Sequence, residues 1–218
     1  GWRLGIEKQN EYSAHFGLGS KTGIELGEKE GQLSSPATQE AGGQVWTDGN
    51  VIQSAIGQLD HLFTPVQMAG YVQTLADDGE RMQLHLIKSV KSYNFEETVE
   101  ETEIQAVDHV PASKEVFQVV REGMTKATQP GGTSYWYWQG FPLSVASKTG
   151  TPEASGDNLD SCYICYIPAE DPQIAIAVVI EKGGQGYTGA PVARAIAEEY
   201  FFGSQESDEV PATGELLP

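Results

Sequence analysis

Three things are scarce in this 218-residue sequence: cysteine, long apolar runs and basic side chains. Two cysteines are too few for the disulfide framework of a small secreted scaffold. No run of about 20 apolar residues occurs, so the sequence predicts no membrane-spanning helix. Only 13 Lys and Arg accompany 31 Asp and Glu, which gives a formal net charge of −18. That balance argues against a protein that binds nucleic acid or anionic lipid through a basic surface.

The cysteines and histidines also give no metal-binding pattern. Cys162 and Cys165 lie in an apolar segment that is typical of a strand. Residues three apart on a strand point to opposite faces, so a disulfide between them is geometrically poor, and no second pair completes a zinc site. The four histidines lie far apart without ligand spacing. We therefore expect ordinary thiols and no metal site.

What remains is typical of one α+β domain, because 39% of the residues are hydrophobic and both kinds of apolar spacing occur. Apolar spacing and capping residues predict helices at 2–16, 65–76, 113–124 and 190–201. Alternating or continuous apolar runs predict strands at 82–92, 143–151, 162–167 and 174–181. Residues 20–50 are predicted to be a long loop, 96–103 an acidic hairpin or loop, and 203–218 a disordered acidic tail.

The strands are expected to form an antiparallel sheet flanked by helices. The connections between the last three strands are short, which favours antiparallel neighbours. The segment 174–180 is almost continuously apolar, which predicts a central strand.

One strand ends in residues that bear chemistry, Lys148-Thr149-Gly150-Thr151. Thr149 and Thr151 share one face of a strand, so two hydroxyls beside a lysine can hold a carboxylate. Gly150 leaves the backbone bare, so an extended ligand can lie against it. These residues predict an edge strand that binds an acid-terminated peptide by strand addition.

This strand resembles the K-T-G motif of the serine penicillin-recognising enzymes. Other segments resemble class B penicillin-binding proteins in the same order along the chain. Residues 16–26 resemble the family's F-G-x-G…T-G-I-x-L pattern, residues 54–58 its S-I-G-Q pattern and residues 64–69 its T-P-x-Q-x-A pattern. Residues 132–134 resemble its G-T-A pattern, and residues 163–175 its F-x-G-Y-x-P…P-x-I-A pattern. The departure is Cys165, where the family usually has glycine. Taken singly, most of these segments are expected to be scaffold.

The sequence also contains two misleading matches. Lys21-Thr22-Gly23 repeats the tripeptide without a preceding strand, and the resemblance assigns it to a structural loop. Ser92-Tyr93-Asn94 matches the family's S-x-N motif but follows segments that S-x-N precedes in the family, so we interpret it as a chance match. The nucleophile motif S-x-x-K does not occur in these residues. We expect the true S-x-N just before Gly1.

The resemblance implies that residues 1–202 are the C-terminal portion of a D,D-transpeptidase domain. The whole protein would then cross-link peptidoglycan stem peptides ending in D-alanyl-D-alanine, through an acyl-enzyme on a serine outside this chain. The implied catalytic residues here are Lys148 and Thr151, and the implied substrate-binding residues are Thr149, Gly150 and Thr151. The Thr151 backbone N–H would contribute to the oxyanion hole.

The resemblance also implies partners and a location. The partners would be stem peptides and β-lactams, the N-terminal remainder of the protein and other cell-wall synthesis proteins. The location would be the extracytoplasmic face of the bacterial membrane, reached through an N-terminal anchor helix. The chain alone is expected to be inactive, and to expose an apolar sheet face through which it self-associates.

Two alternatives remain open. The first is a β-lactamase or D,D-carboxypeptidase of the same superfamily, which the rate of deacylation would distinguish. The second is a non-catalytic module that binds β-lactam or peptidoglycan. The aromatic run at 135–138 is expected to pack against the strands rather than to line a substrate groove.

Overall fold

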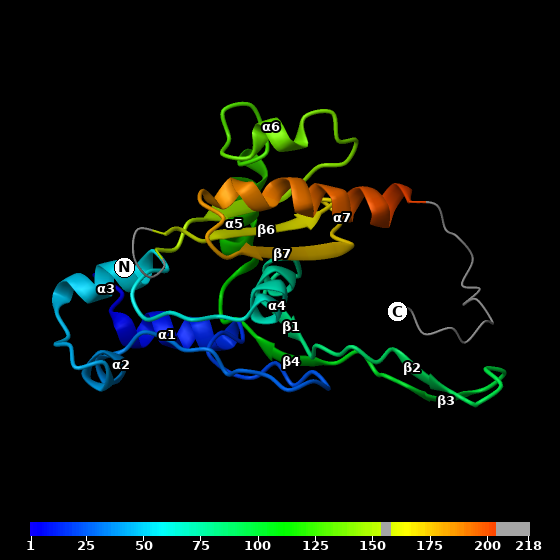
Figure 1. The fold of residues 1–218 in the computed structure, drawn as a ribbon, viewed down its shortest axis with the longest axis horizontal. Coiled ribbons are helices and arrows are strands. Elements are labelled where there is room, and N and C mark those ends of the chain that lie inside the picture. The colour runs from blue at the N-terminus through cyan, green and yellow to red at the C-terminus, as the bar shows by residue number, and fades with distance from the viewer. Residues whose placement is uncertain (154–157, 204–218) are drawn as a thin grey trace.

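A computed structural model describes residues 1–153 and 158–203 of the chain (Figure 1). Most of the predicted acidic tail therefore lies outside the described residues. The helices are α1 Ile6–His15, α2 Pro36–Ala41, α3 Asp48–Ala55, α4 Pro65–Ala76, α5 Lys114–Lys126, α6 Tyr135–Trp138 and α7 Ala190–Phe202, with a 3₁₀ turn η1 at Gly186–Gly189. The strands are β1 Glu80–Met82, β2 Ser89–Lys91, β3 Thr98–Glu101, β4 Ala106–His109, β5 Ala146–Gly150, β6 Ser161–Ile167 and β7 Ile174–Ile180.

The main sheet has three antiparallel strands in the order β5-β6-β7. The predicted fold class, an antiparallel sheet flanked by helices, is confirmed. The prediction that residues 174–180 form the central strand is wrong for the residues described, because β6 is the middle strand. The apolar run in β7 is explained by its two covered faces, since α4 and α7 both pack against this strand.

Both faces of this sheet are covered by helices, as Figure 1 shows. On one face Tyr163, Cys165 and Val178 pack against α6 and α7. On the other face Ala146, Ile164 and Tyr166 pack against α4 and α5. The prediction of an exposed apolar sheet face is therefore wrong for the described residues, and self-association through such a face loses its basis.

Helix α4 begins and ends as predicted. The Thr64 hydroxyl accepts the backbone N–H of Gln67, and the Gln67 side chain accepts the backbone N–H of Thr64, which is a reciprocal capping box. The helix is followed by Asp78 and Gly79, whose φ angles are 49° and 93°. Glycine adopts such angles without strain, so the chain turns sharply here toward β1.

The segment 20–50, predicted to be a loop, contains α2 and begins α3. Each helix starts with a capping box, formed by Ser35 with Thr38 and by Thr47 with Asn50. The two helices span 6 and 8 residues. So short a helix shows little apolar periodicity, which is why the capping residues were the only signal in the sequence.

The single strand predicted at 82–92 is divided in two. β1 pairs with β4, whereas β2 pairs with β3. Between them the Glu25 carboxylate accepts the backbone N–H groups of Leu86 and Ile87, which removes those donors from any strand ladder. The β2–β3 ribbon projects away from the main sheet in Figure 1, and its acidic strand β3 is exposed, which confirms the predicted acidic hairpin.

The helices of the described residues are short or only partly apolar. None of them is long and apolar enough to cross a membrane.

Candidate active site

The segment Lys148–Thr151 lies at the end of β5, an outer strand of the sheet. Among the described residues β5 pairs with β6 alone. Lys148 is exposed, and Thr149, Gly150 and Thr151 are partly exposed. The segment is therefore an accessible strand edge, as its sequence predicts.

The outward side of β5 can be identified from its hydrogen bonds. The Thr128 hydroxyl donates to the Val145 carbonyl at 2.7 Å, and the Gln58 side-chain amide donates to the Thr151 carbonyl at 3.4 Å. Because backbone groups alternate between the two sides of a strand, those of Ser147 and Thr149 face outward as well. This edge can accept the backbone of an added extended peptide.

The side chains of the motif divide between the two faces of β5. Thr149 and Thr151 share one face, and the Thr151 hydroxyl accepts the Gly186 N–H at 2.9 Å. That hydroxyl keeps its own proton, which it can donate to a ligand. Lys148 lies on the opposite face, and its ammonium donates to the Thr149 carbonyl.

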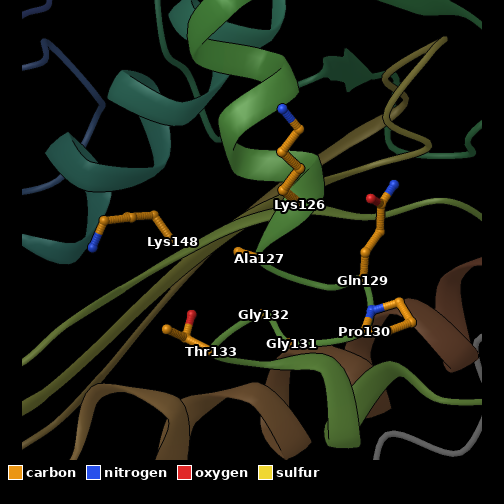
Figure 2. Close-up of a pocket in the computed structure, with 8 residues that line it drawn as sticks. All are labelled: Lys126, Ala127, Gln129, Pro130, Gly131, Gly132, Thr133 and Lys148. Atoms are coloured by element: carbon orange, nitrogen blue, oxygen red, sulfur yellow. The ribbon is translucent and has the colours of Figure 1, made fainter.

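A hollow of about 540 Å³ adjoins Lys148. Figure 2 shows the loop that follows α5 lining it, with Thr133 and Lys148 on the side of the strand. The lining residues are Lys126, Ala127, Gln129, Pro130, Gly131, Gly132, Thr133 and Lys148. They include two lysines, a threonine and a glutamine but no acidic residue, in a chain whose net charge is −18. The hollow therefore favours an anionic or neutral group.

Gly150 has Cys162 on one side and the backbone of Gly186 on another. A Cβ atom on Gly150 would meet the Cys162 Cβ at 3.4 Å, and one on Gly186 would lie 2.3 Å from the Gly150 carbonyl oxygen. Burial raises the pKa of the Cys162 thiol, an effect that Lys148 partly opposes. Burial also raises the pKa of Cys165 to about 12. The cysteines are free and their side chains lie in opposite clusters, which confirms the predicted ordinary thiols.

Two neighbours of the motif lie in segments that the sequence alone predicts to be scaffold. Gln58 contacts both the Thr151 carbonyl and, at 3.4 Å, the Glu153 N–H, so the S-A-I-G-Q segment reaches the motif strand. Ser134, the last residue of Gly-Thr-Ser, lies 2.9 Å from the Ser147 hydroxyl. The only sequence signal that Gln58 and Ser134 lie near the motif was the order of their segments in the family pattern. Neither residue stands in a local pattern that indicates such a contact.

The two misleading matches both lie apart from this site. In the Lys21-Thr22-Gly23 loop, the Glu28 carboxylate accepts the Thr22 hydroxyl and the N–H groups of Thr22 and Gly23. The Ser92-Tyr93-Asn94 segment forms the turn of the β2–β3 ribbon, where the Ser92 hydroxyl donates to the Asn94 side chain. The interpretation of Lys21–Gly23 as a structural loop is confirmed.

One serine–histidine contact has the distance expected of a nucleophile and its base. Ser54 Oγ lies 2.7 Å from His61 Nε2, while the Ser34 N–H donates to His61 Nδ1 at 3.2 Å. With Nδ1 as an acceptor, the neutral ring carries its proton on Nε2 and donates it to Ser54. Burial lowers the pKa of His61, which favours this neutral form. His61 cannot accept the Ser54 proton in this arrangement, so the pair is structural.

The aromatic residues 135–138 form the short helix α6, and its two tryptophans differ in burial. Trp138 is 5% exposed and its indole N–H donates to the Tyr163 hydroxyl at 2.7 Å, so it packs against the sheet as expected. Trp136 is 76% exposed and takes no part in that packing. Within the two described ranges, no three His, Cys, Asp or Glu side chains form a group that could hold a metal ion.

An open strand edge ending in Lys-Thr-Gly-Thr, on an antiparallel sheet with helices on both faces, is the arrangement of the serine penicillin-recognising proteins. The profile of the family "Penicillin binding protein transpeptidase domain" matches residues 2–201. The chain belongs to this family, and its relatives confirm the resemblance to class B penicillin-binding proteins.

Curated relatives match most of this chain but only part of their own length. The chain is 29% identical to the peptidoglycan D,D-transpeptidase MrdA of Salmonella typhimurium over 219 residues, which are 92% of this chain and 35% of that protein. It is 35% identical over 156 residues to the peptidoglycan D,D-transpeptidase PbpA of Mycolicibacterium smegmatis, covering 65% of this chain and 30% of that protein. The chain thus spans about a third of the length of these relatives.

Solved structures share the fold. PBP2 of Pseudomonas aeruginosa, in complex with WCK 5153, superposes with a TM-score of 0.79 at 25% identity, covering 98% of this chain and 48% of that one. Penicillin-binding protein A of M. tuberculosis, as its penicillin G acyl-enzyme, gives a TM-score of 0.75 at 26% identity, covering 92% and 44%.

Proposed function

We propose that this chain forms the substrate-gripping part of a peptidoglycan D,D-transpeptidase of class B. The observation that carries the proposal is the accessible edge at Lys148–Thr151, beside a hollow that lacks acidic side chains. Similarity to two proteins named peptidoglycan D,D-transpeptidases supports it. The domain portion proposed is residues 1–202.

Each residue of the motif takes a different part in this reaction. Thr149 and Thr151 hold the terminal carboxylate of a D-alanyl-D-alanine peptide or of a β-lactam, since both can donate a hydroxyl proton to it. Gly150 lets the ligand backbone approach the strand. Lys148 supplies positive charge near the reacting serine. The outward-facing Thr151 N–H stabilises the oxyanion that forms when the serine attacks.

The nucleophile comes from outside these 218 residues in this proposal, because they contain no S-x-x-K segment. The serine of that segment attacks the peptide carbonyl, expels D-alanine and leaves an acyl-enzyme. An amine of a second stem peptide then attacks the ester, which forms the cross-link and frees the serine. Neither step requires a metal or an organic cofactor.

The proposed location is the extracytoplasmic face of the bacterial membrane, where peptidoglycan stem peptides are found. The proposed partners are the N-terminal remainder of the protein and other cell-wall synthesis proteins. In support, a similar structure, with 28% identity and a TM-score of 0.75, is described as that of a peptidoglycan synthase complex.

The proposal is tested by incubating the complete protein, as its gene encodes it, with a fluorescent penicillin. We expect one covalent label per molecule, lost when the serine of its S-x-x-K segment is changed to alanine. The 218-residue chain alone is expected to remain unlabelled. A saturable covalent label on the chain alone would contradict the proposal, and rapid turnover of penicillin by the complete protein would indicate a β-lactamase instead.

A further inference from the structure

A row of buried hydrogen bonds lies directly behind the motif strand. The Trp138 indole N–H donates to the Tyr163 hydroxyl at 2.7 Å, and burial raises the pKa of Tyr163, a larger effect that the nearby hydroxyls of Ser134 and Ser147 partly oppose. The two serine oxygens are 2.9 Å apart, and Ser134 donates to the Ala127 carbonyl at 3.1 Å. Ser134, Ser147 and Tyr163 are fully buried.

The chemistry of its two ends gives this row one direction. The Trp138 N–H can only donate, and the Ala127 carbonyl can only accept. Since Ser134 gives its proton to the Ala127 carbonyl, the Ser147 hydroxyl donates to Ser134. Burial raises the pKa of Tyr163, so this hydroxyl keeps its proton at neutral pH. The proton of each serine hydroxyl is therefore committed to one acceptor, which makes the contact between Ser134 and Ser147 rigid.

The row connects three parts of the candidate site. Ser147 directly precedes Lys148, and Tyr163 is the strand partner of Thr149. Ser134 directly follows Gly131–Thr133, which line the hollow. The Ser134 N–H also donates to the Ala127 carbonyl at 2.9 Å, so Ser134 closes the loop 127–134 with two bonds, and its contact with Ser147 joins that loop to β5. The family pattern has alanine at the position of Ser134, so this hydroxyl does not follow from the resemblance.

We infer that Ser134 and Ser147 are positioning residues, which set the location of Lys148 and Thr149 relative to the wall of the hollow. This inference rests on the proposed function. The two serines are buried and touch neither ligand nor nucleophile; they act through the residues next to them. Losing either hydroxyl leaves the other without its partner and loosens the loop near Lys148, although the Thr128 hydroxyl still bonds to the Val145 carbonyl.

The test uses the complete protein with Ser134→Ala, Ser147→Ala and the double substitution. We expect the acylation rate by fluorescent penicillin to fall about tenfold in each single variant, the factor that ~1.4 kcal/mol of barrier represents. The double variant should lose little more than either single variant, because the two hydroxyls act as one unit. Hydrogen exchange at the backbone N–H of Ser134 should become faster in all three.

Thr74→Val is the matched control. Thr74 is also fully buried, and its hydroxyl donates to the Gly70 carbonyl at 2.9 Å within α4. This variant should lower the melting temperature about as much as Ser147→Ala, while its acylation rate stays that of the wild type.

Acylation rates equal to wild type in both serine variants, or additive losses in the double variant, would overturn the inference. A wild-type protein that does not react with penicillin contradicts the proposed function and with it the catalytic side of this inference. Hydrogen exchange then still decides whether the serine pair holds the loop, so the two failures are distinguishable.

Discussion

The chain contains the same tripeptide twice, and the two copies have opposite surroundings. In Lys21-Thr22-Gly23 the Glu28 carboxylate occupies the Thr22 hydroxyl and two backbone N–H groups. In Lys148-Thr149-Gly150 the backbone lies on the open edge of β5, and the neighbouring hollow contains no carboxylate. The first copy already binds a carboxylate of its own chain, whereas the second can receive one from outside. Whether such a short motif can bind a ligand therefore depends on whether its hydrogen-bond donors are still unoccupied.

The largest difference between the two copies is expected at their lysines. In the complete protein, Lys148→Ala should lower the rate of acylation by fluorescent penicillin about 10²–10³-fold, because an electrostatic group facing the reaction is lost. Lys21→Ala, the matched control, should leave that rate unchanged. Similar losses in both variants, or none in either, would contradict the assignment of the site to Lys148.

The two glycines should separate stability from activity. A Cβ atom on Gly150 meets Cys162 at 3.4 Å, an ordinary contact, so Gly150→Ala should leave stability nearly unchanged while it slows acylation by obstructing the ligand. Gly23 has a φ of 86°, so Gly23→Ala should destabilise the protein by about 1 kcal/mol without slowing acylation. Urea denaturation and penicillin labelling measure the two effects. A Gly150→Ala variant that is acylated at the wild-type rate would show that no ligand lies against this strand.

The smallest expected effect concerns pH. The Thr22 hydroxyl, followed by smaller backbone contributions, lowers the pKa of Glu28 below its ordinary value. A carboxyl group with a lowered folded pKa stabilises the protein above its unfolded pKa, and this contribution is lost as the pH falls through the folded value. The protection factor of hydrogen exchange at the Thr22 and Gly23 amides, relative to the unfolded chain at the same pH, should therefore fall in acid.

The control for this effect is Glu28→Gln, in which the exchange should lose that acid-dependent step. An equal acid-dependent step at Thr149 would mean that the two copies do not differ as described here.

The sequence predicted the elements that depend on local or periodic signals. Thr64 and Pro65 marked the start of α4, and the apolar run at 174–180 marked a strand. It failed where a distant side chain decides the backbone. The strand predicted at 82–92 is interrupted because Glu25, far away in sequence, binds the N–H groups of Leu86 and Ile87. The two short helices of residues 36–55 were missed because their signal is limited to capping boxes.

The candidate site divides in the same way. The sequence located Lys148–Thr151 and predicted an open edge, because alternation and a bare glycine are local properties. It did not reveal that Gln58 reaches the Thr151 carbonyl, or that Ser134 and Ser147 join behind the strand. Those contacts span 93 and 13 residues of sequence, and no local pattern encodes them.

By itself, the sequence determined the family, the longer helices and strands and the candidate tetrapeptide Lys148–Thr151, because each is written in neighbouring residues. The tertiary structure alone decided which hydrogen-bond donors of each Lys-Thr-Gly copy are already occupied. A hydrogen-bond donor is available only where no other part of the chain has already bonded to it. Folding places the Glu28 carboxylate against the first copy and leaves the second copy on the open edge of β5.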